Sequence, residues 1–258
     1  MYTIGKFVLF GDSITQHSSD LPESGNGFVL APALQSLYAR KLDIVTRGFS
    51  GYNTNQTKVV LRETLKADHA ETGAIKLMSI FMGTNDAAFN FQGVPIDAYK
   101  ANLQEMVRLA QLYNIKLIIV GPALHGRAEC LAASEAQGLE PNFSDTVATR
   151  KYADAAASVA ASNGVPFVDL WNSFQKFGGW SAEDLLQGKV VLKELLPDGI
   201  HFSPQAYRIM YDELLKVIAK NYPELVAENL PMYFPAYDAM DSDNIEESIL
   251  EYAREHAD

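Results

Sequence analysis

Five largely apolar segments, separated by segments with helical periodicity, constrain the fold more than any other feature of this sequence. Phe7–Phe10 and Leu117–Val120 are apolar at every position, which is typical of strands buried on both faces. Such strands, alternating with helices, predict a parallel sheet that is covered by helices on both sides. We therefore expect an α/β fold: a three-layer α/β/α sandwich around a mostly parallel five-stranded sheet.

The expected strands and helices alternate from residue 6 to residue 220. The predicted strands are Lys6–Phe10, Leu42–Phe49, Lys76–Gly83, Lys116–Gly121 and Val165–Leu170. The predicted helices are Phe28–Arg40, Asn53–Leu65, Pro95–Tyr113, Asp145–Asn163 and Ser203–Lys220. Because crossovers between parallel strands are right-handed, the strand ends that lead into helices share one edge of the sheet. Ligands of open α/β sheets bind at that edge.

The composition fits one large globular domain. The chain has 258 residues, of which 48% are hydrophobic and 21% are charged. No apolar stretch approaches the roughly 20 residues of a membrane span. The N-terminal residues lead directly into the first predicted strand without a signal peptide, so we expect a cytoplasmic protein. The single cysteine, Cys130, excludes an internal disulfide, and no sequence motif calls for a metal or a nucleotide cofactor.

Charge is concentrated at the C-terminus. Met232–Asp258 contains eight acidic residues and one arginine, and so carries −7 of the formal net charge of −11. An acidic chain disfavours nucleic-acid binding and suits neutral or hydrophobic substrates. We expect residues 1–222 to form one domain and residues 223–258 to form an acidic C-terminal extension. Leu230–Tyr237 is rich in proline and aromatic residues, which suggests that the extension is a lid over the active site or a contact in a homodimer.

Small and polar residues gather where three predicted strands end. These ends read Gly11-Asp12-Ser13, Gly48-Phe49-Ser50-Gly51 and Gly83-Thr84-Asn85-Asp86. Taken alone, Gly51 suits a turn, and Asn85 suits a helix cap or an Asx-turn. Taken together at one edge, they supply a serine nucleophile, Ser13, with a backbone N–H from Gly51 and a side-chain amide from Asn85 to stabilise an oxyanion.

A histidine base for Ser13 is available in the segment Asp198-Gly199-Ile200-His201. Asp198 precedes His201 by three residues, and Gly199 lets the backbone fold tightly between them. The carboxylate can then accept the Nδ1 proton and leave Nε2 to face a nucleophile. The alternative for this segment is a polar turn before a helix that is capped by Ser203. His17 is a less favoured base, because it has no carboxylate at that spacing.

These motifs, in this order, resemble the four sequence blocks of the SGNH hydrolases, also called GDSL esterases and lipases. The resemblance spans roughly residues 6–220. It implies a flavodoxin-like strand order, 2-1-3-4-5, with Ser13 as nucleophile, His201 as base and Asp198 as its orienting acid. It also implies an oxyanion hole formed by the N–H groups of Ser13 and Gly51 and the side chain of Asn85. Longer strings, such as Lys6–Thr15 and Asp198–Ser203, resemble members that hydrolyse short-chain acyl esters of small alcohols, without a cofactor.

Three catalytic alternatives to simple ester hydrolysis, and one non-catalytic alternative, stay open on the sequence. The same residues serve acyl transfer, deacetylation of sugars or lipids, and thioester hydrolysis. A non-catalytic α/β binding module is an alternative of another class. The resemblance also suggests a role in lipid metabolism and a small-molecule ester as the partner.

Other reactive or aromatic residues have plainer interpretations. Cys130, in a predicted helical segment after the fourth strand, is interpreted as an ordinary small apolar side chain. His125 follows that strand at the active edge, and a solvated loop position is favoured over a pocket-lining one. Phe174–Leu186 fits either the wall of an acyl pocket or packing against the last predicted helix of the domain.

Overall fold

The structure is a computed structural model that describes residues 4–22, 25–70, 74–138 and 144–255. The described strands form one parallel sheet in the order β2-β1-β3-β4-β5, which confirms the expected order. These strands are β1 Lys6–Gly11, β2 Asp43–Gly48, β3 Ile75–Phe81, β4 Lys116–Val120 and β5 Phe167–Val168. The expected three-layer α/β class is therefore confirmed.

Helices connect the strands and continue beyond the sheet. The α-helices are α1 Ser13–Gln16, α2 Leu30–Leu37, α3 Thr54–Leu65, α4 Ile96–Leu112, α5 Arg127–Gln137, α6 Thr146–Ser162, α7 Leu170–Gly178, α8 Ala182–Leu186, α9 Pro204–Asn221 and α10 Ile245–Glu255. The 3-10 turns are η1 His17–Ser19, η3 Pro223–Leu225, η4 Ala227–Asn229 and η5 Tyr237–Ala239, and η2 Lys66–Ala70 is a π-helical turn after α3. Asn53 and Gln56 form a capping box at the start of α3.

Two hydrophobic cores lie on opposite faces of the sheet. In β1, Phe7 and Leu9 belong to one core, whereas Val8 and Phe10 belong to the other. The first core is completed mainly by α2, α7 and α9, and the second by α3, α4 and α6. This alternation follows from the two-residue repeat of a strand, and it explains why the central strands are apolar throughout.

The last strand differs from the expected element. Val165–Leu170 was expected, but only Phe167 and Val168 pair with β4, because Asp169 caps the next helix by accepting a hydrogen bond from Asn172 N at 3.0 Å. The first long helix is also shorter than Phe28–Arg40, and Arg40 ends that connection in a left-handed conformation with φ 61°.

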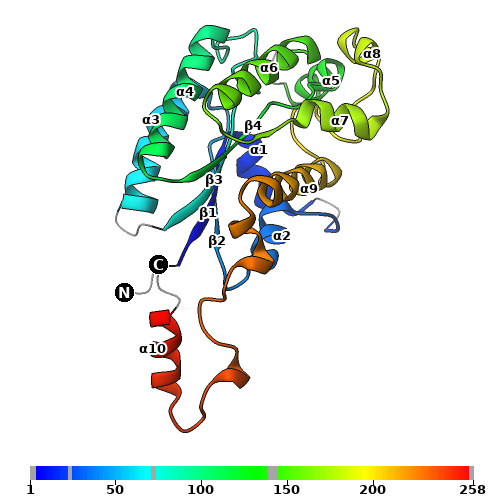
Figure 1. The fold of residues 1–258 in the computed structure, drawn as a ribbon. Helices are drawn as coiled ribbons and strands as arrows, with labels where there is room; N and C mark the ends of the chain where they lie inside the picture. Colours follow the sequence, from blue (N-terminus) through cyan, green and yellow to red (C-terminus); the bar gives the residue numbers. More distant parts are fainter. Residues whose placement is uncertain (1–3, 23–24, 71–73, 139–143, 256–258) are drawn as a thin grey trace.

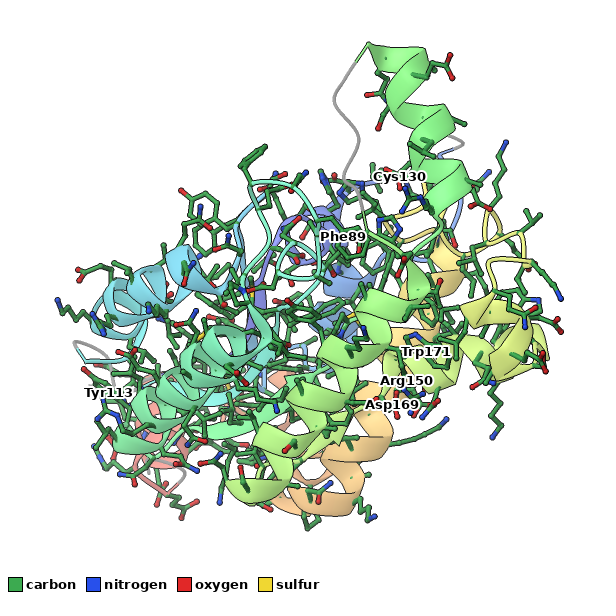
Figure 2. The ribbon with its side chains drawn as sticks, turned by 90° about the horizontal axis from the view of Figure 1, so that it is seen from above. Phe89, Tyr113, Cys130, Arg150, Asp169 and Trp171 are labelled. Atoms are coloured by element: carbon green, nitrogen blue, oxygen red, sulfur yellow. The ribbon has the colours of Figure 1, made fainter. Side chains whose placement is uncertain are left out.

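The segment Phe174–Leu186 contains the second half of α7, the connection to α8, and α8. Phe174 and Leu185 are buried in the first core, and the ring of Phe174 lies 5.1 Å from that of Phe202, between centroids. Core packing is thus the correct interpretation for Phe174, whereas Leu185 both packs in the core and lines a cavity. Between α6 and α7, the guanidinium of Arg150 lies 4.6 Å from the centre of the Trp171 ring (Figure 2).

The C-terminal extension contacts the amino-terminal edge of the sheet. Tyr233 donates its hydroxyl proton to Gly5 O at 2.8 Å, just before β1, and Tyr233 N donates to Arg40 O at 2.7 Å, just before β2. Arg40 in turn donates to Phe234 O and Pro235 O. Helix α10 lies beyond this edge, away from α1 (Figure 1). These contacts contradict the expectation of a lid, because Ser13 follows the opposite end of β1.

No helix in the described part of the chain combines the length and the apolar character that a membrane span requires.

Candidate active site

The carboxyl ends of the three neighbouring strands β2, β1 and β3 bring the predicted site residues to one edge. Gly11, at the end of β1, pairs with Gly48 of β2 and with Phe81 of β3. The turns that follow these positions carry Ser13, Gly51 and Asn85, so their closeness is a consequence of strand register.

Ser13 begins α1 directly after the strand. Asp12 fixes this turn, because its Oδ1 accepts a hydrogen bond from Ile14 N at 3.0 Å. Ser13 is 6% exposed, and the helix it begins is joined to α9 by a hydrogen bond from the Tyr207 hydroxyl to Ile14 O at 2.7 Å. The serine hydroxyl is therefore held at a defined place on the edge.

His201 connects Ser13 to Asp198. Its Nε2 lies 3.0 Å from Ser13 Oγ, and its Nδ1 lies 2.6 Å from Asp198 Oδ2. The other oxygen, Asp198 Oδ1, accepts hydrogen bonds from Ile200 N at 2.9 Å and His201 N at 2.7 Å. With the Nδ1 proton donated to the carboxylate, Nε2 is free to accept the serine proton.

Gly199 gives this loop its shape. Its φ of +82° is in the left-handed region, and a Cβ at this position would lie 2.1 Å from Gly126 O and 2.6 Å from Cys130 N. Gly126 N also donates to Gly199 O at 2.8 Å. The start of α5 thus packs directly on the loop between Asp198 and His201, and only glycine fits there.

The charges of Asp198 and His201 reinforce each other. Burial alone raises the pKa of Asp198, but hydrogen bonds from His201 and the nearby imidazolium charge outweigh burial and hold it below the usual value. Burial alone lowers the pKa of His201, but the hydrogen bond and the charge of Asp198 outweigh it and raise that pKa above 6.5. This imidazole is therefore a stronger base than a free histidine.

Two buried carboxyl groups beside the site, those of Asp12 and Asp86, have raised rather than lowered pKa values. Burial raises the pKa of Asp12 to about 7 and that of Asp86 to about 6. The Oδ2 atoms of both are buried without a hydrogen-bond partner in the described part of the protein. Asp86 Oδ1 accepts from Thr54 N at 3.0 Å and from the Thr54 hydroxyl, so it joins the Asn85 turn to the start of α3.

Gly51 and Asn85 lie close to each other at the same edge of the sheet as Ser13. Gly51 has φ +77° in the turn that is closed by the hydrogen bond from Tyr52 N to Phe49 O at 3.1 Å. Asn85 Nδ2 donates to Tyr52 O at 2.9 Å. Since a carboxamide has two N–H groups, one stays available for a ligand. Among the hydrogen bonds between described residues, none uses the N–H of Gly51.

Gln92 was not predicted from the sequence, although it contacts both Gly51 and Asn85. Its Nε2 donates to Gly51 O at 3.0 Å and lies 3.5 Å from Asn85 Oδ1. No motif marks this residue, because it lies in a loop without periodicity, 41 residues beyond Gly51 in the chain. Sequence spacing alone contains no signal for such a contact.

The two other histidines considered in the sequence analysis, His17 and His125, lie in different environments. His17 lies beside the site, with its ring edge-on to His201 at 5.2 Å between centroids, but its Nδ1 pairs with Asp20 Oδ2 at 2.6 Å. His125 is only 2% exposed, so the expected solvated loop position is wrong. Burial lowers the pKa of His125 to about 4, so this imidazole is neutral at pH 7. Cys130 is buried, as predicted for a small apolar side chain.

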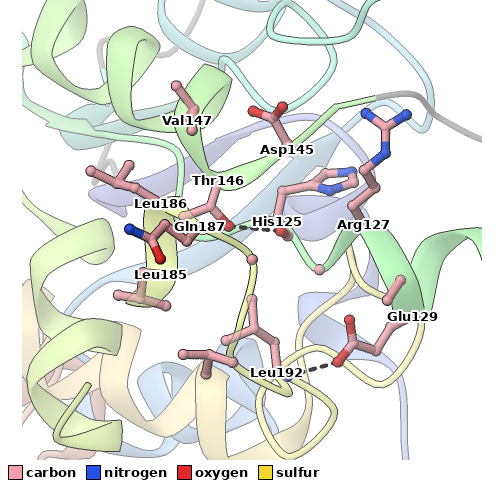
Figure 3. A pocket seen from close by; sticks show the side chains of 14 residues that line it. His125, Arg127, Glu129, Asp145, Thr146, Val147, Leu185, Leu186, Gln187 and Leu192 are labelled. Carbon is pink, nitrogen blue, oxygen red and sulfur yellow. Dashed lines mark hydrogen bonds between the residues drawn. The ribbon is translucent and has the colours of Figure 1, made fainter. Parts of the chain in front are cut away.

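A cavity of about 210 Å³ lies next to this edge, between the starts of α5 and α6 and the end of α8 (Figure 3). Its lining combines His125, Arg127 and Asp145 with apolar side chains such as Leu185 and Leu192. Thr146 Oγ1 donates to His125 O at 2.9 Å, and Glu129 Oε1 accepts from Leu192 N at 2.8 Å (Figure 3).

The described residues include no group of three or more His, Cys, Asp or Glu side chains suited to hold a metal ion.

Comparisons with known proteins give a family model and named relatives that this chain resembles. Residues 9–209 match the model of the GDSL-like Lipase/Acylhydrolase family. The chain is 37% identical over 229 residues to the isoamyl acetate-hydrolyzing esterase of Saccharomyces cerevisiae, covering 87% of this chain and 90% of that protein. It is 32% identical to the isoamyl acetate-hydrolyzing esterase 1 homolog of Bos taurus, covering 85% of this chain and 84% of the relative.

Solved structures share the fold at lower identity. The lipase/acylhydrolase from Enterococcus faecalis aligns with a TM-score of 0.58 at 21% identity, covering 89% of this chain and 98% of that one. A catalytic mutant of the acetylxylan esterase Axe2 from Geobacillus stearothermophilus aligns with a TM-score of 0.61 at 20% identity, covering 84% of this chain and 96% of that one.

Proposed function

Since the chain belongs to the GDSL-like lipase/acylhydrolase family and is a carboxylic ester hydrolase, we propose that it cleaves short-chain acyl esters of small alcohols, such as isoamyl acetate. The observation that carries this proposal is the line of contacts from Ser13 Oγ to His201 Nε2 at 3.0 Å and from His201 Nδ1 to Asp198 at 2.6 Å. The isoamyl acetate-hydrolyzing relatives support the choice of substrate.

In the acylation step, Ser13 Oγ attacks the acyl carbon of the ester while His201 Nε2 takes the serine proton. The carbonyl oxygen becomes an oxyanion, and the N–H groups of Ser13 and Gly51 and the Asn85 amide donate to it. The bond from the acyl carbon to the alcohol oxygen then breaks, and His201 returns the proton to the departing alcohol. Asp198 stays ionised and holds His201 in the required tautomer.

In the deacylation step, His201 takes a proton from water, and the water oxygen attacks the acyl-enzyme. The same donors hold the second oxyanion, and the bond to Ser13 Oγ breaks as His201 returns the proton to the serine. The products are the carboxylic acid and a regenerated enzyme.

The test is hydrolysis of a p-nitrophenyl ester series, from acetate to octanoate, by the wild type and by Ser13→Ala. We expect activity that falls as the acyl chain lengthens and that is lost in Ser13→Ala. A serine-reactive organophosphonate should label Ser13 in the wild type and nothing in the variant. Equal hydrolysis by both proteins would refute Ser13 as the nucleophile, and a maximum at long chains would refute the short-chain preference.

We also propose that residues 1–222 form the hydrolase domain and residues 223–258 its acidic extension. Support comes from the end of α9 at Asn221 and from the contacts that the following residues make with Gly5 and Arg40. The homodimer, the cytoplasmic location and the role in lipid metabolism stay predictions.

A further inference from the structure

The loop between Ala88 and Val94 fixes Gln92 close to two neighbouring turns. Gln92 N donates to Asn90 Oδ1 at 3.0 Å, and Asn53 Nδ2 donates to Gln92 O at 2.7 Å. Val94 N donates to Asp86 O at 3.0 Å and closes the loop. Phe89, labelled in Figure 2, is 61% exposed on the same loop. The backbone of Gln92 is thus held by polar contacts while the aromatic residues before it face solvent.

The side chain of Gln92 contacts Gly51 and Asn85, the two residues that we propose as oxyanion donors in addition to Ser13. Its Nε2 donates to Gly51 O at 3.0 Å and lies 3.5 Å from Asn85 Oδ1. A Cβ at Gly51 would lie 3.6 Å from the same nitrogen, so the amide packs directly on this glycine. One half-buried side chain therefore connects the turn after β2 with the turn after β3.

The first contact holds the backbone at Gly51. The carbonyl of Gly51 belongs to the peptide unit between the glycine and Tyr52, inside the turn closed by Tyr52 N and Phe49 O. A donor on that carbonyl opposes rotation of the glycine, which has no side chain of its own to restrict it. The direction of the adjoining Gly51 N–H is restricted as a result.

The second contact decides which end of the Asn85 amide faces the substrate. Oδ1 lies towards the N–H of Gln92, and Nδ2 donates to Tyr52 O at 2.9 Å. A flipped amide would bring its own N–H groups against the Gln92 N–H group, and its oxygen against Tyr52 O. Both contacts would be repulsive, so Gln92 and Tyr52 together keep the donor end of Asn85 available.

We infer that Gln92 is a positioning residue for the oxyanion hole, one that orients the Gly51 N–H and the Asn85 amide without touching a reacting atom. This inference rests on the proposed function. Its physical basis is that oxyanion donors stabilise the transition state only when they are aimed before the reaction begins.

The test substitutes Gln92→Met, which keeps the side-chain length and removes the amide without adding charge. We expect kcat for p-nitrophenyl acetate to fall at least about 10-fold, but less than the about 10²–10³-fold expected for complete loss of one oxyanion donor. KM should stay within about twofold, because the lost stabilisation belongs to the transition state. Gln92→Glu is a second variant, which also lacks the donor.

The matched control is Gln104→Met. Gln104 also donates its amide, to Asn163 Oδ1 at 2.6 Å, but it lies on the exposed face between α4 and the end of α6. The control should retain kcat, and circular dichroism and thermal unfolding should show both variants to be folded.

A double-mutant cycle separates positioning from an independent effect. If Gln92 acts through Asn85, the loss in Asn85→Ala/Gln92→Met will be smaller than the product of the two single losses. Full kcat in both Gln92 variants would overturn the inference while Ser13-dependent hydrolysis stands. Losses that multiply in the double variant would overturn the part of it that acts through Asn85. Hydrolysis that survives Ser13→Ala would instead overturn the proposed function itself.

Discussion

At the scale of single residues, burial and hydrogen bonding act in opposite directions on the charged groups of the site. Asp198 and His201 are partly buried, yet their mutual hydrogen bond and charges outweigh the cost of burial. Asp12 has one backbone donor on its carboxylate, and for this group burial has the larger effect and raises the pKa to about 7. Asp198 accepts three hydrogen bonds and its side chain is 37% exposed, whereas Asp12 is fully buried with one donor, so burial and hydrogen bonding together account for the difference.

The pH dependence should follow from the His201 pair. Because neutral His201 is the proposed base and its pKa is raised above 6.5, kcat/KM of the wild type should increase with pH through an apparent pKa above that value. In Asp198→Asn the raising contacts are weakened while burial remains, so the pKa of His201 should fall, and kcat should fall by up to about 10⁴-fold.

NMR titration of the His201 ring and the pH profile of kcat/KM measure both effects. Asp20→Asn is the matched control, because Asp20 lies 2.6 Å from His17 in a similar pair. The control should keep kcat. A large loss in Asp20→Asn, with normal activity in Asp198→Asn, would identify His17 as the base.

Asn85→Ala should lower kcat by about 10²–10³-fold, because one of the proposed oxyanion donors is lost. The side chain is 5% exposed, and its replacement also removes the donor to Tyr52 O. Thermal unfolding is therefore measured beside the kinetics. A folded variant with wild-type kcat would exclude Asn85 from the oxyanion hole.

At the scale of elements, the fit between the start of α5 and the Asp198–His201 loop determines where the histidine lies. Gly199 permits this fit, since Gly126 O would lie 2.1 Å from any Cβ at that position. Cys130, on α5, packs against the same glycine. The helix after β4 thus supports a loop that lies some 70 residues later in the chain.

Gly199→Ala should reduce both stability and activity. A left-handed conformation costs a residue with a Cβ about 1–2 kcal/mol, and the clash adds to this cost and displaces His201. Gly164→Ala is the matched control, with φ +62° and no atom within 4 Å of the added Cβ. Gly164→Ala should lose only the stability that the left-handed conformation costs, without a clash, and it should keep the wild-type kcat. Equal kcat in the two variants would show that the loop tolerates displacement.

At the scale of the whole molecule, the two edges of the sheet have different roles. The carboxyl-terminal edge carries Ser13, Gly51 and Asn85, and the amino-terminal edge binds the C-terminal extension through Gly5 and Arg40. The six residues of β1 separate Gly5 from Asp12. At about 3.3 Å per residue, this places roughly 20 Å between the two edges.

Tyr233→Phe should therefore reduce stability and leave catalysis unchanged. The variant loses the hydrogen bond from the hydroxyl to Gly5 O at 2.8 Å. The free energy of unfolding should fall by about 1 kcal/mol. Denaturant unfolding measures this change, and kcat/KM for p-nitrophenyl acetate should equal that of the wild type. A loss of kcat/KM would mean that the extension communicates with the site.

The predicted dimer contact has its own test in the deletion of residues 230–258. If the extension joins two subunits, light scattering should show the mass of a dimer for the full chain and that of a monomer for the truncated one. An unchanged mass would contradict the dimer contact. The wild type measured at the same protein concentration is the control.

The sequence by itself determined the sheet, its strand order through the family resemblance, and the edge at which Ser13, Gly51, Asn85, Asp198 and His201 meet. These features depend on local patterns: apolar runs mark buried strands, and small polar residues mark strand ends. The boundaries of the last strand were wrong, because the cap formed by Asp169 begins a helix where hydrophobicity alone indicates a strand. Only the tertiary structure decided that His125 is buried, that the extension lies at the opposite edge, and that Gln92 joins the turns of Gly51 and Asn85. Each of these depends on contacts between loops that are distant in the chain, and periodicity does not encode such contacts.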